Sequence, residues 1–447
     1  MLTELKLSNF RIFDDEVAVR FRPITVFIGH NNSGKSSIIK FLLMLQQSLD
    51  PGKPQFLTPE GNRVQLGIFS ELKNSLTTKK NLHFQLTAKG PSSPSGSFLE
   101  YVKSFDGVEV ARLLYTIDTA ILYGDIQTGH TEYFLVDEKS PDKKLIVRGS
   151  DVSDTSTFLS IPPEVYQKIR FGALDATREM QRVLDGLRES ISNFVAENEF
   201  LDILRHQITA IRHLSAVRED SQRVISASPP PPGDVGQRGQ YALPHLQRMT
   251  DEIKAQGGFE FILPHIKNVA GIENVRFEKP SQYLSQCLGR NYETGADVPI
   301  ANYGFGVSQC LPIFIQGAIM PAQTSLMIEQ PEAQLHPTAQ LEMGSFFCDL
   351  WNKRGVGSII ETHSDNILLR LRRLIATGEL SAKDVSVAYF THDKKNRNMP
   401  VIWNLNINED GSVQSRFPEE FLPAEFFGKN LHEVLKIGSA SRKQSHK

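Results

Sequence analysis

"ITVFIGHNNSGKSSIIKFLLMLQQSL", residues 24–49, is the stretch that decides the fold of this 447-residue chain. It begins with a short apolar run typical of a buried strand and ends with a longer apolar-rich run typical of a helix. A glycine-containing loop, Gly29 to Ser36, joins the two and matches the pattern GxxxxGK[ST]. Strand, glycine loop and helix in this order predict a phosphate-binding loop in an α/β fold.

The loop supplies the groups that hold a nucleoside triphosphate. Its backbone N–H groups wrap the phosphates, Lys35 reaches the outer phosphates, and the Ser36 hydroxyl binds magnesium at the start of a helix whose dipole favours anions. An ordinary glycine turn before a helix is the alternative, and the flanking strand and helix disfavour it. We expect ATP and Mg²⁺ as cofactors, and we expect these ATP-binding residues: Gly29, Asn31, Asn32, Ser33, Gly34, Lys35, Ser36 and Ser37.

Composition argues against several other classes of protein. The 49 basic and 51 acidic residues nearly balance, which disfavours a strongly basic nucleic-acid coat but leaves room for a local patch. Cys287, Cys310 and Cys348 are scattered, without the spacing of a zinc knuckle or a disulfide framework. The first residues do not form a signal-peptide core, and no apolar run is long enough to span a bilayer. We therefore expect a cytoplasmic protein without membrane contact.

The pattern along the chain predicts three parts. Residues 1–160 combine the loop with strand-like runs between residues 81 and 147, which indicate a β-rich sub-lobe. Residues 161–274 show apolar side chains three and four apart, typical of an amphipathic helical insertion, which a proline-rich loop interrupts. Residues 275–447 alternate strands and helices, as in a largely parallel sheet covered by helices. Sustained heptads are missing, so we expect no long coiled coil.

"LMIEQPEAQLHP", residues 326–337, predicts the second half of the site. An apolar strand that ends in an acid delivers that acid to a metal, so Glu329 is expected to join Ser36 at the magnesium ion. Lys35 and Glu329 lie far apart in the sequence. A large segment is therefore inserted between the two halves of the site.

A glycine-rich turn, "GFGVS", precedes an apolar helix shortly before Glu329. Gly304, Gly306 and the hydroxyl of Ser308 could present backbone and side-chain donors to a phosphate. A tight turn before a core helix explains the same residues at least as well. The turn taken alone therefore decides nothing.

The order of the motifs resembles a known group of ATPases. "NFRIF", "GHNNSGKSS", "GFGVSQ", "IEQPEAQLHP" and "ETHSD" stand in the order seen in SMC-like members of the ABC ATPase class. They look most like RecF and OLD-type ATPases and the stand-alone AAA ATPases of bacterial anti-phage systems such as Septu and PARIS. The resemblance covers the first 50 residues and about residues 302–371, and hardly the middle. It implies an ABC-type head built from residues 1–160 and 275–447, without a nuclease domain.

The resemblance also implies how subunits assemble. ATP on the Lys35 loop of one subunit is expected to be capped by the signature turn of another, in a head-to-tail dimer or a higher homo-oligomer. The residues of that turn are Gly304, Gly306, Ser308 and Gln309. Leu335 and His336 take the place of the loop that crosses between subunits in this class.

Two further roles follow from the same resemblance. His363, after the strand-like run "SIIET", is expected to be the switch histidine near the γ-phosphate, although a lone histidine after a strand is more often structural. Gln65 is a candidate for the metal- and water-sensing glutamine that such ATPases place after the first helix. A polar residue at a strand edge needs no further role, so that assignment of Gln65 stays open.

Gln330 departs from the usual pattern, because most ABC-type ATPases have a glutamate after the metal-site acid. Glutamine cannot take a proton as a carboxylate does, but it can orient water, which is compatible with slow hydrolysis. Pro331 favours an extended Gln330, and residues two apart on an extended segment face the same side, so Glu332 becomes a candidate base. Glu332 is equally suited to complement the dipole of a helix that begins near Pro337. The expected catalytic set is Gln330, Glu332 and His363, and a laboratory substitution at Gln330 that traps ATP stays possible.

Our main hypothesis is an ATPase that assembles through ATP-sandwiched subunits and controls a separate nuclease or toxin, as the anti-phage resemblance implies. No nuclease signature follows the ATPase motifs, so the effector must be another chain. Residues 205–223 carry four arginines among histidines, which suits nucleic acid or a partner, although most such runs are solvated helix faces. A nucleotide-sensing scaffold with negligible hydrolysis and a RecF-like DNA-repair clamp are the alternatives. A clamp would bind DNA with a strong salt dependence, and a scaffold would co-purify with its partner.

Overall fold

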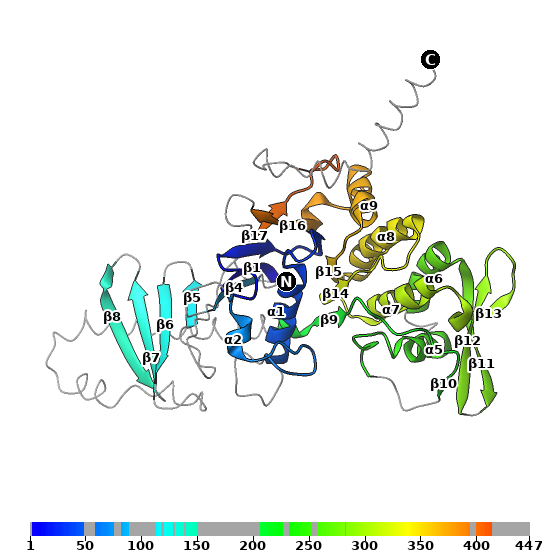
Figure 1. Cartoon of the computed structure of the whole chain (residues 1–447), viewed down its shortest axis with the longest axis horizontal. Coiled ribbons are helices and arrows are strands. Elements are labelled where there is room, and N and C mark those ends of the chain that lie inside the picture. Colours follow the sequence, from blue (N-terminus) through cyan, green and yellow to red (C-terminus); the bar gives the residue numbers. More distant parts are fainter. Residues whose placement is uncertain are drawn as a thin grey trace, which may run out of the picture. The chain divides into compact units, whose positions relative to one another are not determined.

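A computed structural model describes residues 2–48, 59–75, 82–88, 113–117, 120–127, 130–137, 140–149, 206–226, 232–252, 257–281, 283–393 and 399–413 (Figure 1). The chain divides into two compact units. The first contains Met1–Val19 and Ser37–Thr209, and the second contains Arg20–Ser36 and Ala210–Lys447. The phosphate loop up to Ser36 therefore belongs to the same unit as the motifs of the C-terminal half.

The first unit contains a three-stranded sheet with the order β2-β1-β4, made of β1 (Leu2–Ser8), β2 (Val17–Arg20) and β4 (His83–Ala88). Most of α1 (Lys35–Ser48) and the short helix α2 (Phe69–Leu72) belong to the same unit. Phe41 of α1 packs edge-on against Phe10 and Phe84, with ring centroids 5.2 and 5.0 Å apart. These rings form part of the core of the first unit.

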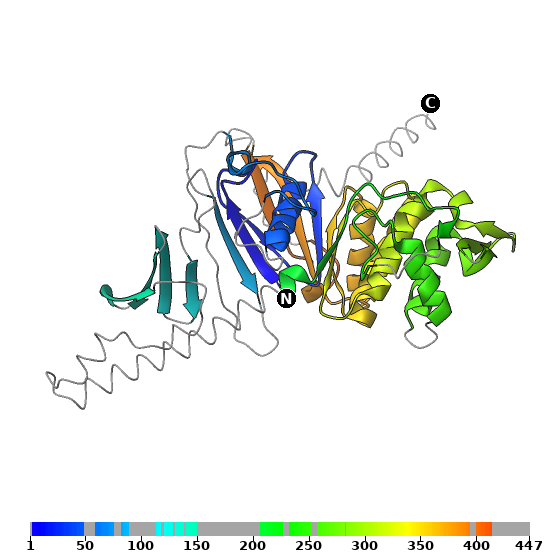
Figure 2. The same ribbon diagram turned by 90° about the horizontal axis from the view of Figure 1, so that it is seen from below.

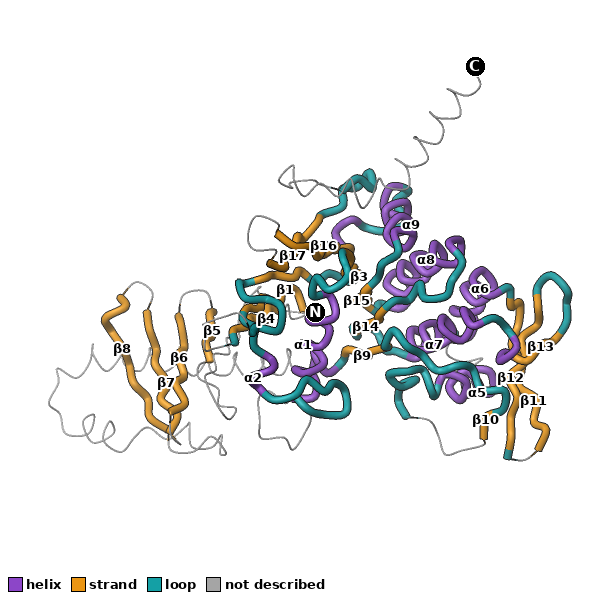
Figure 3. The backbone as a smooth tube through the Cα atoms, in the orientation of Figure 1, coloured by secondary structure: helices purple, strands orange, loops and turns teal. Residues whose placement is uncertain are grey.

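A second sheet of the first unit runs strictly in chain order (Figure 3). Its antiparallel strands are β5 (Leu113–Ile117), β6 (Ala120–Gln127), β7 (His130–Asp137) and β8 (Ser140–Gly149). Short connections between successive strands produce such a meander. The strand-like runs after residue 81 therefore do form strands, as predicted.

The second unit is built on a six-stranded sheet with the order β17-β16-β3-β15-β14-β9. Five strands are parallel, namely β3 (Ile24–Gly29), β9 (Ile211–Leu214), β14 (Ser325–Glu329), β15 (Gly357–Glu361) and β16 (Val385–Asp393). The edge strand β17 (Met399–Leu405) is antiparallel. Every residue of β3 and β15 is buried, which explains their continuous apolar character. The α/β fold class is thus confirmed.

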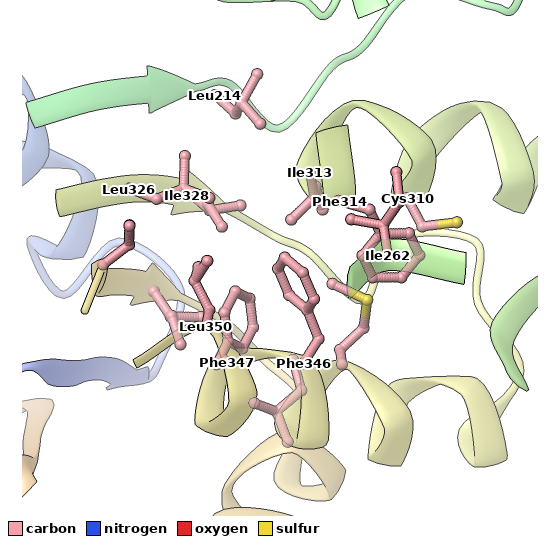
Figure 4. Packing of buried hydrophobic residues seen from close by; sticks show 14 of the residues in the cluster. Leu214, Ile262, Cys310, Ile313, Phe314, Leu326, Ile328, Phe346, Phe347 and Leu350 are labelled. Atoms are coloured by element: carbon pink, nitrogen blue, oxygen red, sulfur yellow. The ribbon is translucent and has the colours of Figure 1, made fainter. Parts of the chain in front are cut away.

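Helices pack against this sheet and against one another (Figure 2). They are α5 (Ala242–Glu252), α6 (Gly258–Ala270), α7 (Phe305–Ile319), α8 (Pro337–Arg354) and α9 (Asp365–Ala376). Figure 4 shows aromatic rings of α7 and α8 packed beside Leu326 and Ile328 of β14. The rings of Phe314 and Phe346 lie 4.8 Å apart at their centroids. The six-stranded sheet and these helices therefore share one buried apolar core.

A small antiparallel sheet completes the second unit. It contains β10 (Ile225–Ser226), β11 (Ile272–Ser281), β12 (Leu284–Asn291) and β13 (Asp297–Pro299). The 3-10 turn η2 (Ile300–Asn302) then leads to α7, and η3 (Ala382–Asp384) leads to β16.

One expectation about the middle of the chain is wrong. Residues 211–214 lie within the predicted helical insertion, but they form β9, which pairs in parallel with β14. Ile211 and Leu214 are buried in that strand, because sheet pairing overrides the local helical period. Residues 150–205, where most of the helical pattern lies, are outside the described residues. The division at residues 160 and 274 stays a prediction, and the described part contains no long coiled coil.

Candidate nucleotide site

The predicted loop lies between the end of β3 and the start of α1. Gly29 has a φ of +141° and Gly34 a φ of +102°, which residues with a side chain rarely adopt. A Cβ atom at Gly29 would lie 2.0 Å from the carbonyl oxygen of Phe390 on β16. Only glycine lets the chain turn so close to the neighbouring strand.

Lys35 folds back over the loop. Its Nζ donates to the carbonyl oxygens of Gly29 at 3.0 Å and His30 at 2.6 Å, and the residue is only 4% exposed. Burial lowers the pKa of Lys35, while the carboxylates of Glu361 and Glu332 oppose that shift. The ammonium is held within the curve of the loop, where phosphate oxygens can replace the two carbonyl oxygens.

Glu361 is the acid that contacts the phosphate loop directly. It ends β15, which lies between β3 and β14, and it pairs in register with Glu329 at the end of β14. The Ser36 hydroxyl donates to Glu361 Oε1 at 2.9 Å, and Glu361 Oε2 is buried without a hydrogen-bond partner. Burial raises the pKa of Glu361 to about 7, and the charge of Glu329 adds to the rise.

Glu329 is held from the other side, by residues of β9 and the segment after it. His213 Nε2 lies 2.7 Å from Glu329 Oε1. Arg218 Nη2 donates to the Glu329 carbonyl oxygen at 2.6 Å. Arg218 is 2% exposed, and burial lowers its pKa to about 10. The hydroxyl of Ser36 bonds to Glu361, so a metal-binding role for Glu329 stays a prediction.

Gln330 is not extended, contrary to expectation. Its φ is +46°, in the left-handed region, and its N–H donates to the Glu361 carbonyl oxygen at 2.7 Å. Its own carbonyl oxygen accepts the Ala333 N–H at 3.1 Å, which closes a turn. These bonds override the preference that Pro331 imposes on the residue before it.

Glu332 nevertheless lies in the site. Its Oε1 accepts the backbone N–H of His363 at 2.7 Å, and its Oε2 is buried without a hydrogen-bond partner. Burial lowers the pKa of His363, and the charge of Lys35 lowers it further. The helix near Pro337 does begin there as α8, but Glu332 accepts a hydrogen bond from the backbone of His363 rather than from that helix. The geometry thus brings Lys35, Glu332 and His363 together.

The glycines of the signature turn lie at the start of α7. Gly304 precedes the helix, and a Cβ atom there would meet no atom within 4 Å. A Cβ atom at Gly306 would lie 2.8 Å from the Gln334 carbonyl oxygen, just before the Leu335-His336 pair. His336 Nδ1 accepts the Thr338 N–H at 3.4 Å and so caps α8. A role of this pair between subunits stays a prediction.

Ser308 and Gln309 are buried and contact a segment of their own chain. The Ser308 hydroxyl oxygen accepts the Ser221 N–H at 3.1 Å, and Gln309 Nε2 donates to the Arg218 carbonyl oxygen at 3.4 Å. As an acceptor in its bond, Ser308 keeps its own hydroxyl hydrogen for another partner. Capping of ATP in another subunit stays a prediction for both residues.

Two predicted residues belong to the first unit, Ser37 and Gln65. Ser37 directly follows Ser36 within α1. Gln65 forms an isolated β-bridge with Glu60. Its role at the metal stays a prediction.

The sequence model of one family, described as an AAA ATPase domain, matches residues 1–93 and 136–368, which is well over half of the chain. The chain belongs to the AAA ATPase domain family. The match includes the phosphate loop, the signature turn, Glu329 and the first residues of α9. No curated protein sequence matches the chain.

Solved structures similar to this AAA ATPase domain include heads of SMC proteins. The SMC head domain from Thermotoga maritima has 9% identity and a TM-score of 0.37, over 91% of this chain and 99% of that chain. The SmcHead bound to the C-winged helix domain of ScpA has 11% identity and a TM-score of 0.38, over 91% and 98%. The Smc head domain with an extended coiled coil, bound to the C-terminal domain of ScpA derived from Pyrococcus furiosus, has 10% identity and a TM-score of 0.37, over 99% of both chains. Among the helices that can be described here, none is long and apolar enough to cross a membrane.

Three site residues of this ATPase domain were missed from the sequence. Glu361 had the same signal as Glu329, because an apolar strand ends in each acid. His213 and Arg218 lie in the arginine-rich run that was interpreted mainly as a solvated face. That interpretation is wrong for Arg218, which is buried, and only the strand pairing of β9 reveals why.

The residues at the loop fit a magnesium nucleotide. Within the described ranges, no group of three or more His, Cys, Asp or Glu side chains could hold a metal alone. Mg²⁺ at a nucleotide takes only one or two carboxylates, with phosphate and water completing its oxygen ligands. The Ser36 hydroxyl and the unpartnered Oε2 of Glu361 are ligands of that kind.

Proposed function

We propose that this AAA ATPase domain binds Mg-ATP on the loop that contains Lys35 and hydrolyses it slowly. The observation that carries the proposal is the meeting of three groups from distant segments. The Ser36 hydroxyl, next to Lys35 in the loop, donates to Glu361 Oε1 at 2.9 Å, and Glu332 Oε1 accepts the N–H of His363, two residues after Glu361, at 2.7 Å. The charges of Glu361 and Glu332 also oppose the lowering of the Lys35 pKa by burial. A cation, two acids and a glycine loop are the groups that phosphoryl transfer from ATP to water uses.

The roles of the side chains follow from their contacts. Lys35 leaves the Gly29 and His30 carbonyl oxygens to bind the outer phosphates, and the loop amides bind the others. Magnesium, when bound with the nucleotide, neutralises developing negative charge on the phosphates. Ser36 would hold it there together with an acid at the end of a strand, for which the order of the motifs predicts Glu329.

Glu332 is the proposed base for the attacking water. One of its carboxylate oxygens is fixed by the His363 N–H, and the other is free of hydrogen bonds. That oxygen takes a proton as the water oxygen bonds to the γ-phosphorus and the bond to ADP breaks. Gln330 orients the water through its amide, and His363 donates towards the γ-phosphate. Hydrolysis is slow because the position beside Glu329 offers no carboxylate.

Assembly through sandwiched ATP is the proposed use of the signature turn. Gly304 and Phe305 are exposed at the start of α7, so their amides are accessible to the phosphates of a nucleotide on another subunit. The effector that this assembly controls is a separate nuclease or toxin in anti-phage defence. The control of an effector rests on the resemblance of the motifs alone, and it does not require this chain to bind DNA directly.

Gln330 favours a second candidate, a nucleotide-sensing scaffold that closes on ATP and hardly hydrolyses it. Steady-state ATP hydrolysis with magnesium separates the two candidates when the parent is compared with Lys35→Ala and Gln330→Glu at matched protein concentration. Steady turnover by the parent that Lys35→Ala abolishes supports the ATPase. A parent that binds ATP without turnover, together with an active Gln330→Glu, supports the scaffold. A parent that binds no ATP contradicts both.

A further inference from the structure

The carboxylate of Glu361 stands at the phosphate loop without a complete set of partners. The residue is 4% exposed, and its Oε1 accepts the hydrogen of the Ser36 hydroxyl. Its Oε2 is buried and has no hydrogen-bond partner. A buried carboxylate oxygen without a partner is costly unless a ligand supplies the missing interaction.

The neighbouring acid, Glu329, has a different set of contacts. His213 lies against one of its carboxylate oxygens, and Arg218 holds its carbonyl oxygen. The order of the motifs alone assigns the metal to Glu329. The contacts instead place Glu361 next to Ser36, because β15 lies between the strand of the loop and the strand of Glu329.

We propose that Glu361, together with the Ser36 hydroxyl, is a ligand of the divalent cation that accompanies the nucleotide. This assignment rests on the proposed function, because the cation is the one bound with ATP. Hydroxyl and carboxylate oxygens are hard ligands that suit Mg²⁺. The Ser36 hydroxyl gives its hydrogen to Glu361, so its oxygen lone pairs remain for the cation. Glu361 therefore both orients the Ser36 hydroxyl and binds the cation itself.

The test is the binding of a fluorescent ATP analogue to the full chain, measured once in EDTA and once in magnesium. The variants are Glu361→Gln, Glu361→Asp and, as a control, Glu379→Gln, which removes the same charge at an exposed position of the same unit. Glutamine keeps an acceptor for the Ser36 hydroxyl but lacks the charge that a cation needs. A purely structural role of Glu361 would therefore leave the effect of magnesium unchanged.

We expect the parent and Glu379→Gln to bind the analogue more tightly in magnesium than in EDTA. Glu361→Gln should bind the analogue in EDTA at least as tightly as the parent, because the variant lacks a negative charge beside the phosphates, and this binding also reports an intact fold. Its gain in affinity from magnesium should be at least about tenfold smaller than that of the parent. Glu361→Asp should recover part of the gain. Electron paramagnetic resonance of Mn²⁺ with ADP should show less bound Mn²⁺ in Glu361→Gln than in the parent.

The assignment is overturned if magnesium raises the affinity of Glu361→Gln for the analogue as much as it raises that of the parent. It is also overturned if magnesium does not raise the affinity of the parent. In both of those cases the proposed nucleotide binding still stands. A parent that binds no analogue in either solution overturns the proposed function and this assignment with it. The two failures are therefore distinguishable.

Discussion

At the scale of single residues, the burial of Glu361 makes the stability of the folded protein depend on pH. Burial raises its pKa from the ordinary 4.5 to about 7 in the folded chain. Between these values the folded protein holds a proton that the unfolded chain has released. The proton on Glu361 therefore stabilises the folded protein fully below about pH 4.5, and this stabilisation is lost as the pH rises to about 7. Without magnesium, the deprotonated site is the less stable one.

We predict that Glu361→Gln stabilises the metal-free protein at high pH. Above pH 7 in EDTA, the variant should exceed the parent in free energy of unfolding by up to about 3 kcal/mol, and the advantage should shrink towards pH 5. Urea denaturation across this pH range, with Glu379→Gln as the control, measures the difference. A difference between variant and parent that stays constant from pH 5 to pH 8 would contradict the prediction.

Single residues also mark the limit of prediction from the sequence. The glycine loop with Lys35 and Ser36 could be predicted because its motif is local and fixed by backbone geometry. The left-handed Gln330 and the buried Arg218 could not, because bonds to residues distant in the sequence decide both.

At the scale of elements, strand order explains why the site forms. β3, β15 and β14 are parallel neighbours, so their carboxyl ends meet at one edge of the sheet and gather the loop and the two acids. The strands themselves were predictable as apolar runs. Their order was not, because the local pattern of apolar residues does not determine which strands pair. For the same reason β9 was not predicted, since its residues follow a helical apolar spacing.

We predict that Gly29→Ala disrupts the junction of β3 and β16. The new methyl group would meet the Phe390 carbonyl oxygen, and the backbone at Gly29 is strained for any side chain. The free energy of unfolding should fall by about 2–4 kcal/mol, and nucleotide binding should weaken because Lys35 depends on this loop. Denaturation and nucleotide titration measure the two effects.

Gly233→Ala is the matched control, since a Cβ atom at Gly233 would meet no atom within 4 Å. It should leave both quantities close to those of the parent. Equal stability of the Gly29→Ala variant and the parent would show that the close approach of the two strands is not required.

At the scale of the whole molecule, the proposed assembly divides one ATP site between two subunits. Lys35 is supplied by the subunit that holds the nucleotide, and Ser308 by the other. The described chain contains both residues, but nothing in the sequence decides whether they meet across subunits. That step depends on surfaces and partners rather than on local pattern.

We predict that two inactive variants restore hydrolysis when mixed. Lys35→Ala lacks the binding lysine, and Ser308→Ala lacks the capping hydroxyl. Random pairing of equal amounts gives mixed dimers with one complete site, so activity should return to about a quarter of the parental rate. Steady-state hydrolysis before and after mixing measures this. A mixture as inactive as its components would argue against shared sites.

The central claim, a nucleotide site that hydrolyses ATP through Glu332, is tested most directly by single-turnover conversion of bound ATP to ADP. Excess parent protein with magnesium should convert the ATP, and Glu332→Gln should bind ATP with similar affinity but convert it about 10²–10⁴ times more slowly. Conversion by Glu332→Gln at the parental rate would contradict the assignment of the base. Unconverted ATP on the parent itself would contradict hydrolysis altogether.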